Sequence, residues 1–216
     1  MNRNVLLAAS AIVLTGGFAV AASAYRSNAT SAVNAIARDE SNSLTPAHAQ
    51  RLGDPAARVV IVEFFDPACE TCAAFAPVAK GLVETHPGQV QLVLRYAAFH
   101  KGSDTMVAIL EASRRQDKYW ETLEIMFATQ SQWASHHDPQ PDRIWPLLEA
   151  GGLDVTRLRA DMTDPAIDAV ILADAKDGEK LGVNKTPSFF VNERPLTRFG
   201  QAQLTALVEA EIAAAY

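Results

Sequence analysis

The residues best suited to chemistry are Cys69 and Cys72, the only two cysteines among 216 residues. Cysteines three positions apart at the start of a predicted helix lie on one face, one turn apart, so their sulfur atoms can bond to each other. That bond would close a loop of only about four residues, and by the chain-entropy estimate it would add little stability. The spacing therefore favours reversible thiol chemistry, with a passive disulfide as the alternative.

The predicted place of Cys69 at a helix N-terminus suits a nucleophile. Unpaired N–H groups and the positive end of the helix dipole favour the thiolate and lower the pKa of a thiol there. We therefore predict that Cys69 attacks and that Cys72 resolves the product. Glu70 and Thr71, which lie between them, are predicted to tune the pKa of Cys69, because the Glu70 carboxylate opposes a nearby thiolate.

Metal binding is a further alternative for a cysteine pair. Two cysteines exclude a four-cysteine zinc site, and the five histidines show no ligand spacing relative to them. We predict no metal site and no cofactor, although a thiol pair that holds a soft ion such as Cu(I) would fit the same residues.

The elements that position the cysteines follow from hydrophobic periodicity. Val59 to Phe65 reads as a central strand interrupted only by Glu63, Cys69 to about His86 as a helix, and Val90 to Tyr96 as a second strand. Strand, helix and strand predict a right-handed parallel crossover. A helical block follows, and then a strand at Ser188–Val191, a short partner strand near Thr197–Phe199 and a helix over Gln201–Tyr216. The order βαβ, helices and ββα predicts an α/β fold.

The composition and the N-terminal sequence limit the possible partners and the cellular location of the protein. A net charge of -6, with no basic run, argues against nucleic acid as a partner. Residues 1–24 hold an apolar stretch that ends in Ala22-Ser23-Ala24, which predicts a signal peptide or an N-terminal membrane anchor. Residues 25–52 read as a linker and 53–216 as the folded domain. The predicted location is the periplasm or another extracytoplasmic space, with the protein either soluble after signal cleavage or anchored to the inner membrane.

Several motifs in order resemble the DsbA-like thioredoxin-fold family of thiol:disulfide oxidoreductases. They are Gly53-Asp54-Pro55, Ile61 to Asp66 running into Cys69-Glu70-Thr71-Cys72, and Lys185-Thr186-Pro187-Ser188 with the strand that follows. The likeness implies a thioredoxin fold with a central mixed sheet and a helical insertion at about 104–181. It also implies an enzyme that exchanges disulfides.

The resemblance assigns roles residue by residue. Cys69 becomes the exposed attacking thiol and Cys72 its buried partner, while Pro187 becomes a cis-proline facing them and Thr186 offers backbone groups to a substrate chain. Glu63 becomes a buried acid that exchanges protons with Cys72, and Arg95 becomes the basic partner of that acid. A buried structural ion pair is the alternative for these last two residues.

The chain departs from the family pattern at Glu70-Thr71, where strong oxidases carry Pro-His, and at Lys185 and Glu193, where glycines are common. The resemblance predicts an exported oxidoreductase that exchanges its disulfide with cysteines of client proteins and has a membrane redox partner. A reductase or isomerase recharged by a membrane electron donor is the alternative within the enzymes. Outside them, the fold could serve as a non-catalytic binding module.

Overall fold

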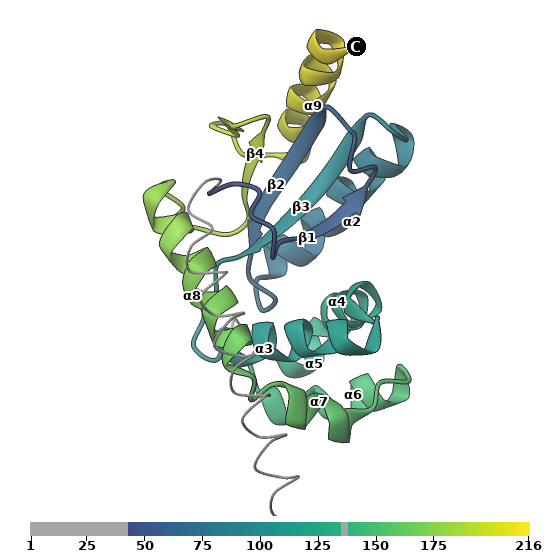
Figure 1. Ribbon diagram of the computed structural model, residues 1–216, viewed down its shortest axis with the longest axis vertical. Helices are drawn as coiled ribbons and strands as arrows, with labels where there is room; N and C mark the ends of the chain where they lie inside the picture. The colour runs from purple at the N-terminus through teal and green to yellow at the C-terminus, as the bar shows by residue number, and fades with distance from the viewer. Residues whose placement is uncertain (1–42, 135–137) are drawn as a thin grey trace, which may run out of the picture.

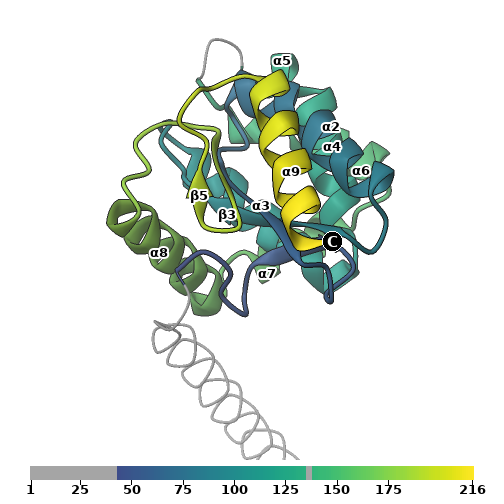
Figure 2. The ribbon, with the colours of Figure 1, turned by 90° about the horizontal axis from the view of Figure 1, so that it is seen from above.

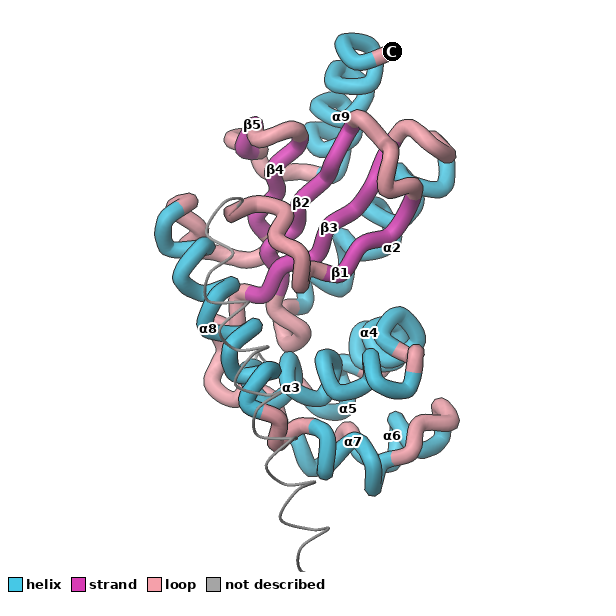
Figure 3. The backbone as a smooth tube through the Cα atoms, viewed as in Figure 1, coloured by secondary structure: helices cyan, strands magenta, loops and turns pink. Residues whose placement is uncertain are grey.

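The computed structural model describes residues 43–134 and 138–216. The predicted signal peptide or anchor at 1–24 and most of the predicted linker lie outside the described residues. The described chain is built on a five-stranded mixed sheet of order β1-β3-β2-β4-β5 (Figures 1 and 3). The strands are β1 (Gln50–Gly53), β2 (Val59–Phe65), β3 (Val90–Tyr96), β4 (Ser188–Val191) and β5 (Arg194–Pro195).

Strand β2 is central because its residues are apolar on both faces, which suits a strand covered on both sides. It pairs parallel to β3 and antiparallel to β4. Helices α2 (Glu70–Thr85) and α9 (Gln201–Ala215) pack side by side on one face of the sheet (Figure 2). The other face holds a smaller apolar cluster around Phe64 and Phe190, covered by residues near Leu44 and Leu181.

A block of helices separates β3 from β4 and lies at one end of the sheet (Figure 1). Its helices are α3 (Ser103–Ser113), α4 (Tyr119–Ala128), α5 (Gln130–Trp133), α6 (Trp145–Ala150), α7 (Val155–Asp161) and α8 (Pro165–Lys180), with short 3-10 turns at Arg114–Gln116 and Pro141–Arg143. The block occupies the place expected for the helical insertion. The predicted fold class, a mixed central sheet made of βαβ and then ββα, is confirmed.

Two strands differ from the prediction. Strand β1 begins inside the predicted linker, at Gln50, and pairs antiparallel with β3, so the described fold starts before Gly53. Its sequence, Gln-Arg-Leu-Gly, carries one large apolar residue, so the strand depends on pairing with β3 more than on β propensity. Strand β5 lies at Arg194–Pro195, before the predicted Thr197–Phe199, because Asn192 and Glu193 form a two-residue turn with φ of 45° and 68°.

The predicted pairing of Arg95 with Glu63 is wrong. In the β2–β3 register Glu63 lies opposite Leu94, whereas Arg95 lies opposite Phe64. Successive side chains of a strand point to opposite faces, so the Glu63 and Arg95 side chains are on opposite sides of the sheet. The Arg95 guanidinium carbon lies 5.1 Å from the centre of the Phe64 ring.

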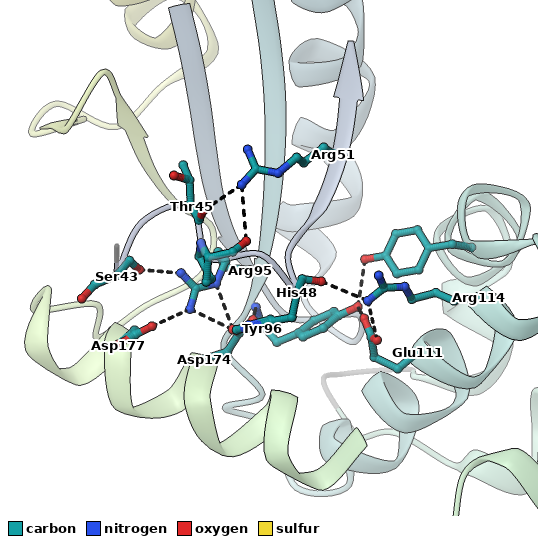
Figure 4. Close-up of polar contacts among 12 residues, drawn as sticks. Ser43, Thr45, His48, Arg51, Arg95, Tyr96, Glu111, Arg114, Asp174 and Asp177 are labelled. Atoms are coloured by element: carbon teal, nitrogen blue, oxygen red, sulfur yellow. Dashed lines mark hydrogen bonds and ion pairs between the residues drawn. The ribbon is translucent and has the colours of Figure 1, made fainter. Parts of the chain in front are cut away.

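Arg95 instead forms a buried cluster with α8 (Figure 4). Its guanidinium donates to the carboxylates of Asp174 and Asp177, each at 2.9 Å, and the Arg95 side chain is fully buried. Asp174 also accepts a hydrogen bond of 2.7 Å from the amide of Tyr96 and lies 2.6 Å from Nε2 of His48. This cluster therefore ties the segment before β1, strand β3 and helix α8 together.

We expect Arg95→Met to lower the free energy of unfolding by about 3–5 kcal/mol, because two buried carboxylates would lose their cation. Urea denaturation of the reduced protein measures this. Lys80→Ala is the control: Lys80 and Glu124 form an exposed pair at 2.6 Å, and its loss should change stability by less than about 1 kcal/mol. Equal losses in the two variants would contradict the structural importance of the Arg95 cluster.

Candidate active site

The two cysteines lie where β2 gives way to α2. Strand β2 ends at Phe65, and Cys69 is the N-cap of α2, with φ of -78° and ψ of 115°. An extended N-cap residue turns its side chain back to the free amides of the first helical turn. Here the Cys69 sulfur accepts a hydrogen bond from the amide of Cys72 at 3.4 Å. The helix start therefore holds the Cys69 sulfur at its positive end.

The two thiols differ in their protonation. The hydrogen bond with the Cys72 side chain is the largest influence on Cys69 and, with smaller hydrogen bonds and against an opposing effect of burial, lowers the pKa of its thiol from 9.0 to about 5. Burial, together with the charges of Glu63 and Cys69, raises the pKa of Cys72 far above its ordinary value. At neutral pH the site therefore holds a thiolate at Cys69 and a thiol at Cys72.

The solvent exposure of Cys69 and Cys72 differs less than the resemblance implied. Both cysteines are free thiols, and Cys69 is 4% exposed whereas Cys72 is 0% exposed. Cys69 is thus the more accessible sulfur, but most of its surface is covered.

The loop before β4 covers one side of the Cys69 sulfur. The bond between Thr186 and Pro187 is cis, as the resemblance implied, and Pro187 is buried. The Cys69 sulfur lies 3.5 Å from the Thr186 carbonyl oxygen, to which it donates a hydrogen bond when protonated, and a hydrogen bond with the Thr186 side chain helps to lower the pKa of Cys69. Residues 117 positions apart in the sequence thus meet at one sulfur atom.

Glu63 lies beneath the cysteines on the face of β2 that α2 covers. It is 3% exposed, and burial followed by the charge of Cys69 raises the pKa of its carboxyl from 4.5 to about 8. The charge of Glu63 in turn contributes to the raised pKa of Cys72. The structure therefore brings Glu63, Cys69 and Cys72 into one electrostatic unit, from which Arg95 is absent.

The prediction missed Asp66, the last residue before the turn into the cysteine motif. Its carboxylate is fully buried and accepts hydrogen bonds from the amides of Ala68, Phe99 and His100 at 2.8 to 3.0 Å. The Nδ1 atom of His100 lies 2.7 Å from the same carboxylate. An aspartate followed by proline at the end of a strand was the available signal, since aspartate often bonds to amides of the turn that follows.

Glu70 and Thr71 are both exposed to solvent. The amide of Thr71 adds a hydrogen bond that lowers the pKa of Cys69, whereas the exposed carboxylate of Glu70 acts across solvent that screens its charge. Of the two departures near the proline loop, Lys185 lies in the loop, with Nζ 5.9 Å from the ring centre of Phe199. Glu193 lies in the β4–β5 turn.

The comparisons with known proteins agree with this geometry. A sequence model described as thioredoxin matches residues 45–210. The chain belongs to the thioredoxin family. A thioredoxin-like oxidoreductase from Silicibacter pomeroyi is 30% identical, with a TM-score of 0.69 over 82% of this chain and 99% of that chain. The α-DsbA1 protein of Wolbachia pipientis, 16% identical over 79% of this chain and 94% of its own, has the same fold with a TM-score of 0.67.

Two curated relatives extend the comparison. A Na⁺/H⁺ antiporter NhaA of Herminiimonas arsenicoxydans is 27% identical over 73% of this chain, and a putative protein-disulfide oxidoreductase of Rickettsia conorii is 26% identical over 65% of it. The match spans only 25% of the antiporter and 52% of the Rickettsia protein. The resemblance to DsbA-like thioredoxin-fold proteins is confirmed. The predicted enzyme class, an oxidoreductase, is also the class given for the Silicibacter and Rickettsia proteins.

We expect Glu70→His to lower the pKa of Cys69 by about one unit or less, because it removes a screened negative charge near the thiolate. The rate of iodoacetamide alkylation against pH measures this pKa. Glu84→His, on the same helix but remote from its N-terminus, is the matched control. A rise in the pKa of Cys69 in the Glu70 variant would show that the carboxylate does not oppose the thiolate.

We expect Glu63→Gln to become more stable than the wild type as pH rises. Folded Glu63 keeps its proton to about pH 8, but the unfolded chain releases it near pH 4.5. The folded state then binds more protons, so the contribution of Glu63 to stability falls from about pH 4.5 to 8. The glutamine variant lacks this loss. Over that pH window its free energy of unfolding should therefore rise relative to that of the wild type by on the order of 3–5 kcal/mol.

Urea denaturation of reduced protein at pH 5 and pH 8.5 tests this prediction. Glu124→Gln, an exposed carboxyl group, is the control and should show no such change. A stability difference between Glu63→Gln and the wild type that stays constant between the two pH values would mean that Glu63 ionises normally in the folded protein.

Proposed function

We propose that the chain is a thiol:disulfide oxidoreductase that exchanges a Cys69–Cys72 disulfide with cysteines of client proteins. The observation that carries the proposal is the opposite protonation of two neighbouring thiols. A thiolate at Cys69 is a good leaving group and nucleophile, whereas Cys72 holds its proton until the mixed disulfide must be resolved. A passive disulfide would need neither property.

In the oxidising direction, a client thiolate attacks Cys69 in the Cys69–Cys72 disulfide. The sulfur of Cys72 leaves with the bonding electron pair and takes a proton from Glu63. A second client thiolate then attacks the client sulfur of the mixed disulfide, and Cys69 leaves as a stable thiolate. The client loses two electrons and the cysteine pair gains them, and the reverse sequence reduces a client disulfide.

Glu63 suits the proton step because its carboxyl group is buried and its pKa, about 8, lies near neutral pH. A group with its ordinary pKa of 4.5 would be ionised at pH 7 and could not supply a proton. The role assigned to Arg95 is not part of this mechanism, since its side chain lies on the other face of the sheet.

Clients are proposed to bind beside Thr186 and Pro187. A hollow of about 140 Å³ lies against this loop, lined by Pro187 and Phe199 among others. Phe199 is 44% exposed, and its ring centre lies 4.7 Å from that of Phe75 on α2, with 32° between the ring planes. An extended client segment could pair with the backbone of this loop while an apolar side chain covers Phe199.

The cellular setting also belongs to the proposal. Export, a membrane redox partner and an N-terminal anchor rest on residues 1–24 and on the family resemblance. Within residues 43–134 and 138–216, no helix has both the length and the apolar character needed to cross a bilayer. The same described residues hold no group of three or more His, Cys, Asp or Glu side chains arranged around a metal ion. A redox titration against glutathione would decide between oxidase and reductase or isomerase directions.

We expect Cys72→Ala to accumulate mixed disulfides with client proteins, because nothing then resolves the bond at Cys69. Cys69→Ala should accumulate almost none, since the remaining thiol is buried and protonated. Non-reducing electrophoresis with mass spectrometry of the trapped species measures both. Equal trapping by the two variants would overturn the assignment of roles, and no trapping with normal folding would favour a binding module.

A further inference from the structure

A pocket of about 360 Å³ lies between the sheet, α2 and α4, on the side of Glu63. Its floor is formed by Glu63, Leu92 and Leu94, which are 3%, 3% and 4% exposed. These residues share one face because Glu63 and Leu94 are partners in the β2–β3 register. The pocket thus reaches from the molecular surface down to the central strand.

The walls of the pocket are apolar and largely aromatic. Trp120, Leu123 and Phe127 line it from α4, and Phe65 lines it from β2. Lys80 and Glu124 lie at the solvent side of the pocket. Their exposed side chains form an ion pair with each other at 2.6 Å. A cavity of about 150 Å³ already holds benzene, and ligand pockets commonly measure about 300–1,000 Å³. The space therefore suits a flat molecule of about two fused rings.

The carboxyl group of Glu63 is the polar feature of the buried part of this pocket. Among the described residues none of the hydrogen bonds found is made by this carboxyl group, and it is not one of the side-chain groups enclosed without a partner, so its oxygen atoms are open to the pocket. Water in the pocket can therefore be its hydrogen-bond partner. A ligand with a matched donor and acceptor would replace that water and keep the hydrogen bonds.

We propose that this pocket binds a flat, neutral small molecule whose amide or lactam group forms two hydrogen bonds with the Glu63 carboxyl group. A protonated carboxyl group presents one donor and one acceptor side by side, and an amide presents the complementary acceptor and donor. A cationic head group fits less well, because burying an ion pair in an apolar wall incurs a desolvation penalty that a neutral pair avoids. The apolar rings would contact the α4 side chains.

Protonation of Glu63 gives the binding a defined pH dependence. The lactam pairs only with the protonated carboxyl group, whose pKa is about 8 in the reduced protein. The affinity should be constant below that pH and then fall about tenfold per pH unit above it, because the competent form becomes a shrinking fraction. A cationic ligand would show the opposite trend, since ionised Glu63 would attract it.

The test uses isothermal titration calorimetry to measure the affinity of the reduced full chain for 2-quinolinone, a neutral fused bicyclic lactam. The titration is done at pH 6.5, 7.5, 8.5 and 9.5. N-methyl-2-quinolinone, which lacks the donor, is the matched ligand control and should bind about tenfold more weakly. Binding needs neither turnover nor a client protein. A failure here is therefore distinguishable from a failure of the proposed oxidoreductase function.

Four variants locate the site. Glu63→Gln keeps a donor and an acceptor, so it should retain affinity and lose the pH dependence, whereas Glu63→Leu should lose about tenfold in affinity. Ala76→Leu fills the pocket and should abolish binding, whereas Ala74→Leu, on an exposed position of the same helix, should not. Circular dichroism confirms that each variant folds.

No binding of 2-quinolinone to the wild type would overturn the proposal. Binding that is equal for the N-methyl compound, or unchanged in Glu63→Leu, would overturn the role of the carboxyl group and show an apolar cavity only. Binding that survives Ala76→Leu would place the ligand elsewhere on the protein. Affinity that rises above pH 8 would show that the site prefers a cation.

Discussion

The hydrogen bond from the amide of Cys72 to the sulfur of Cys69, at 3.4 Å, is the interaction on which the rest of the site depends. It begins α2, and it also helps to lower the pKa of Cys69, on which the hydrogen bond with the Cys72 side chain is the largest influence. A serine or aspartate could cap the helix equally well. A cysteine at the cap couples helix formation to thiolate formation, so the fold itself stabilises the reactive form.

The surrounding structure serves to hold that helix start in place. Asp66 binds the amide of Ala68 on one side and those of Phe99 and His100 on the other, so the turn into α2 is joined to the loop after β3. Gln130 of α5 donates a hydrogen bond of 2.8 Å to the carbonyl of Pro67, which joins the same turn to the helical insertion. Movement of the helical insertion would therefore displace the turn that precedes the cysteines.

Local patterns predicted much of this fold. Strands β2, β3 and β4 and helices α2 and α9 follow from apolar periodicity, because each buries a continuous face of its own sequence. Strand β1 could not be predicted that way, since its pairing with β3 supplies what its sequence lacks. The cis bond before Pro187 could be predicted only from the family resemblance, because a trans bond is the usual form of any X-Pro pair.

The partners of Arg95 show why side chains of opposite charge are not enough to predict an ion pair. Glu63 and Arg95 lie on adjacent strands, but a shift of one residue in register moves a side chain to the other face of the sheet. The true partners, Asp174 and Asp177, lie 79 and 82 positions further along the chain on α8. Nothing local in the sequence marks them.

Among the described residues no ion pair joins the Glu63 carboxyl group to a cation, and this has a chemical consequence. With Arg95 on the other face, burial and the Cys69 thiolate both favour the protonated carboxyl group. Disulfide formation removes that thiolate, so the pKa of Glu63 should fall, and the acid then gives up its proton more readily. In the proposed mechanism it does so in the oxidised state, from which Cys72 leaves and is protonated. The state of one sulfur atom thus prepares the neighbouring acid for the step that follows.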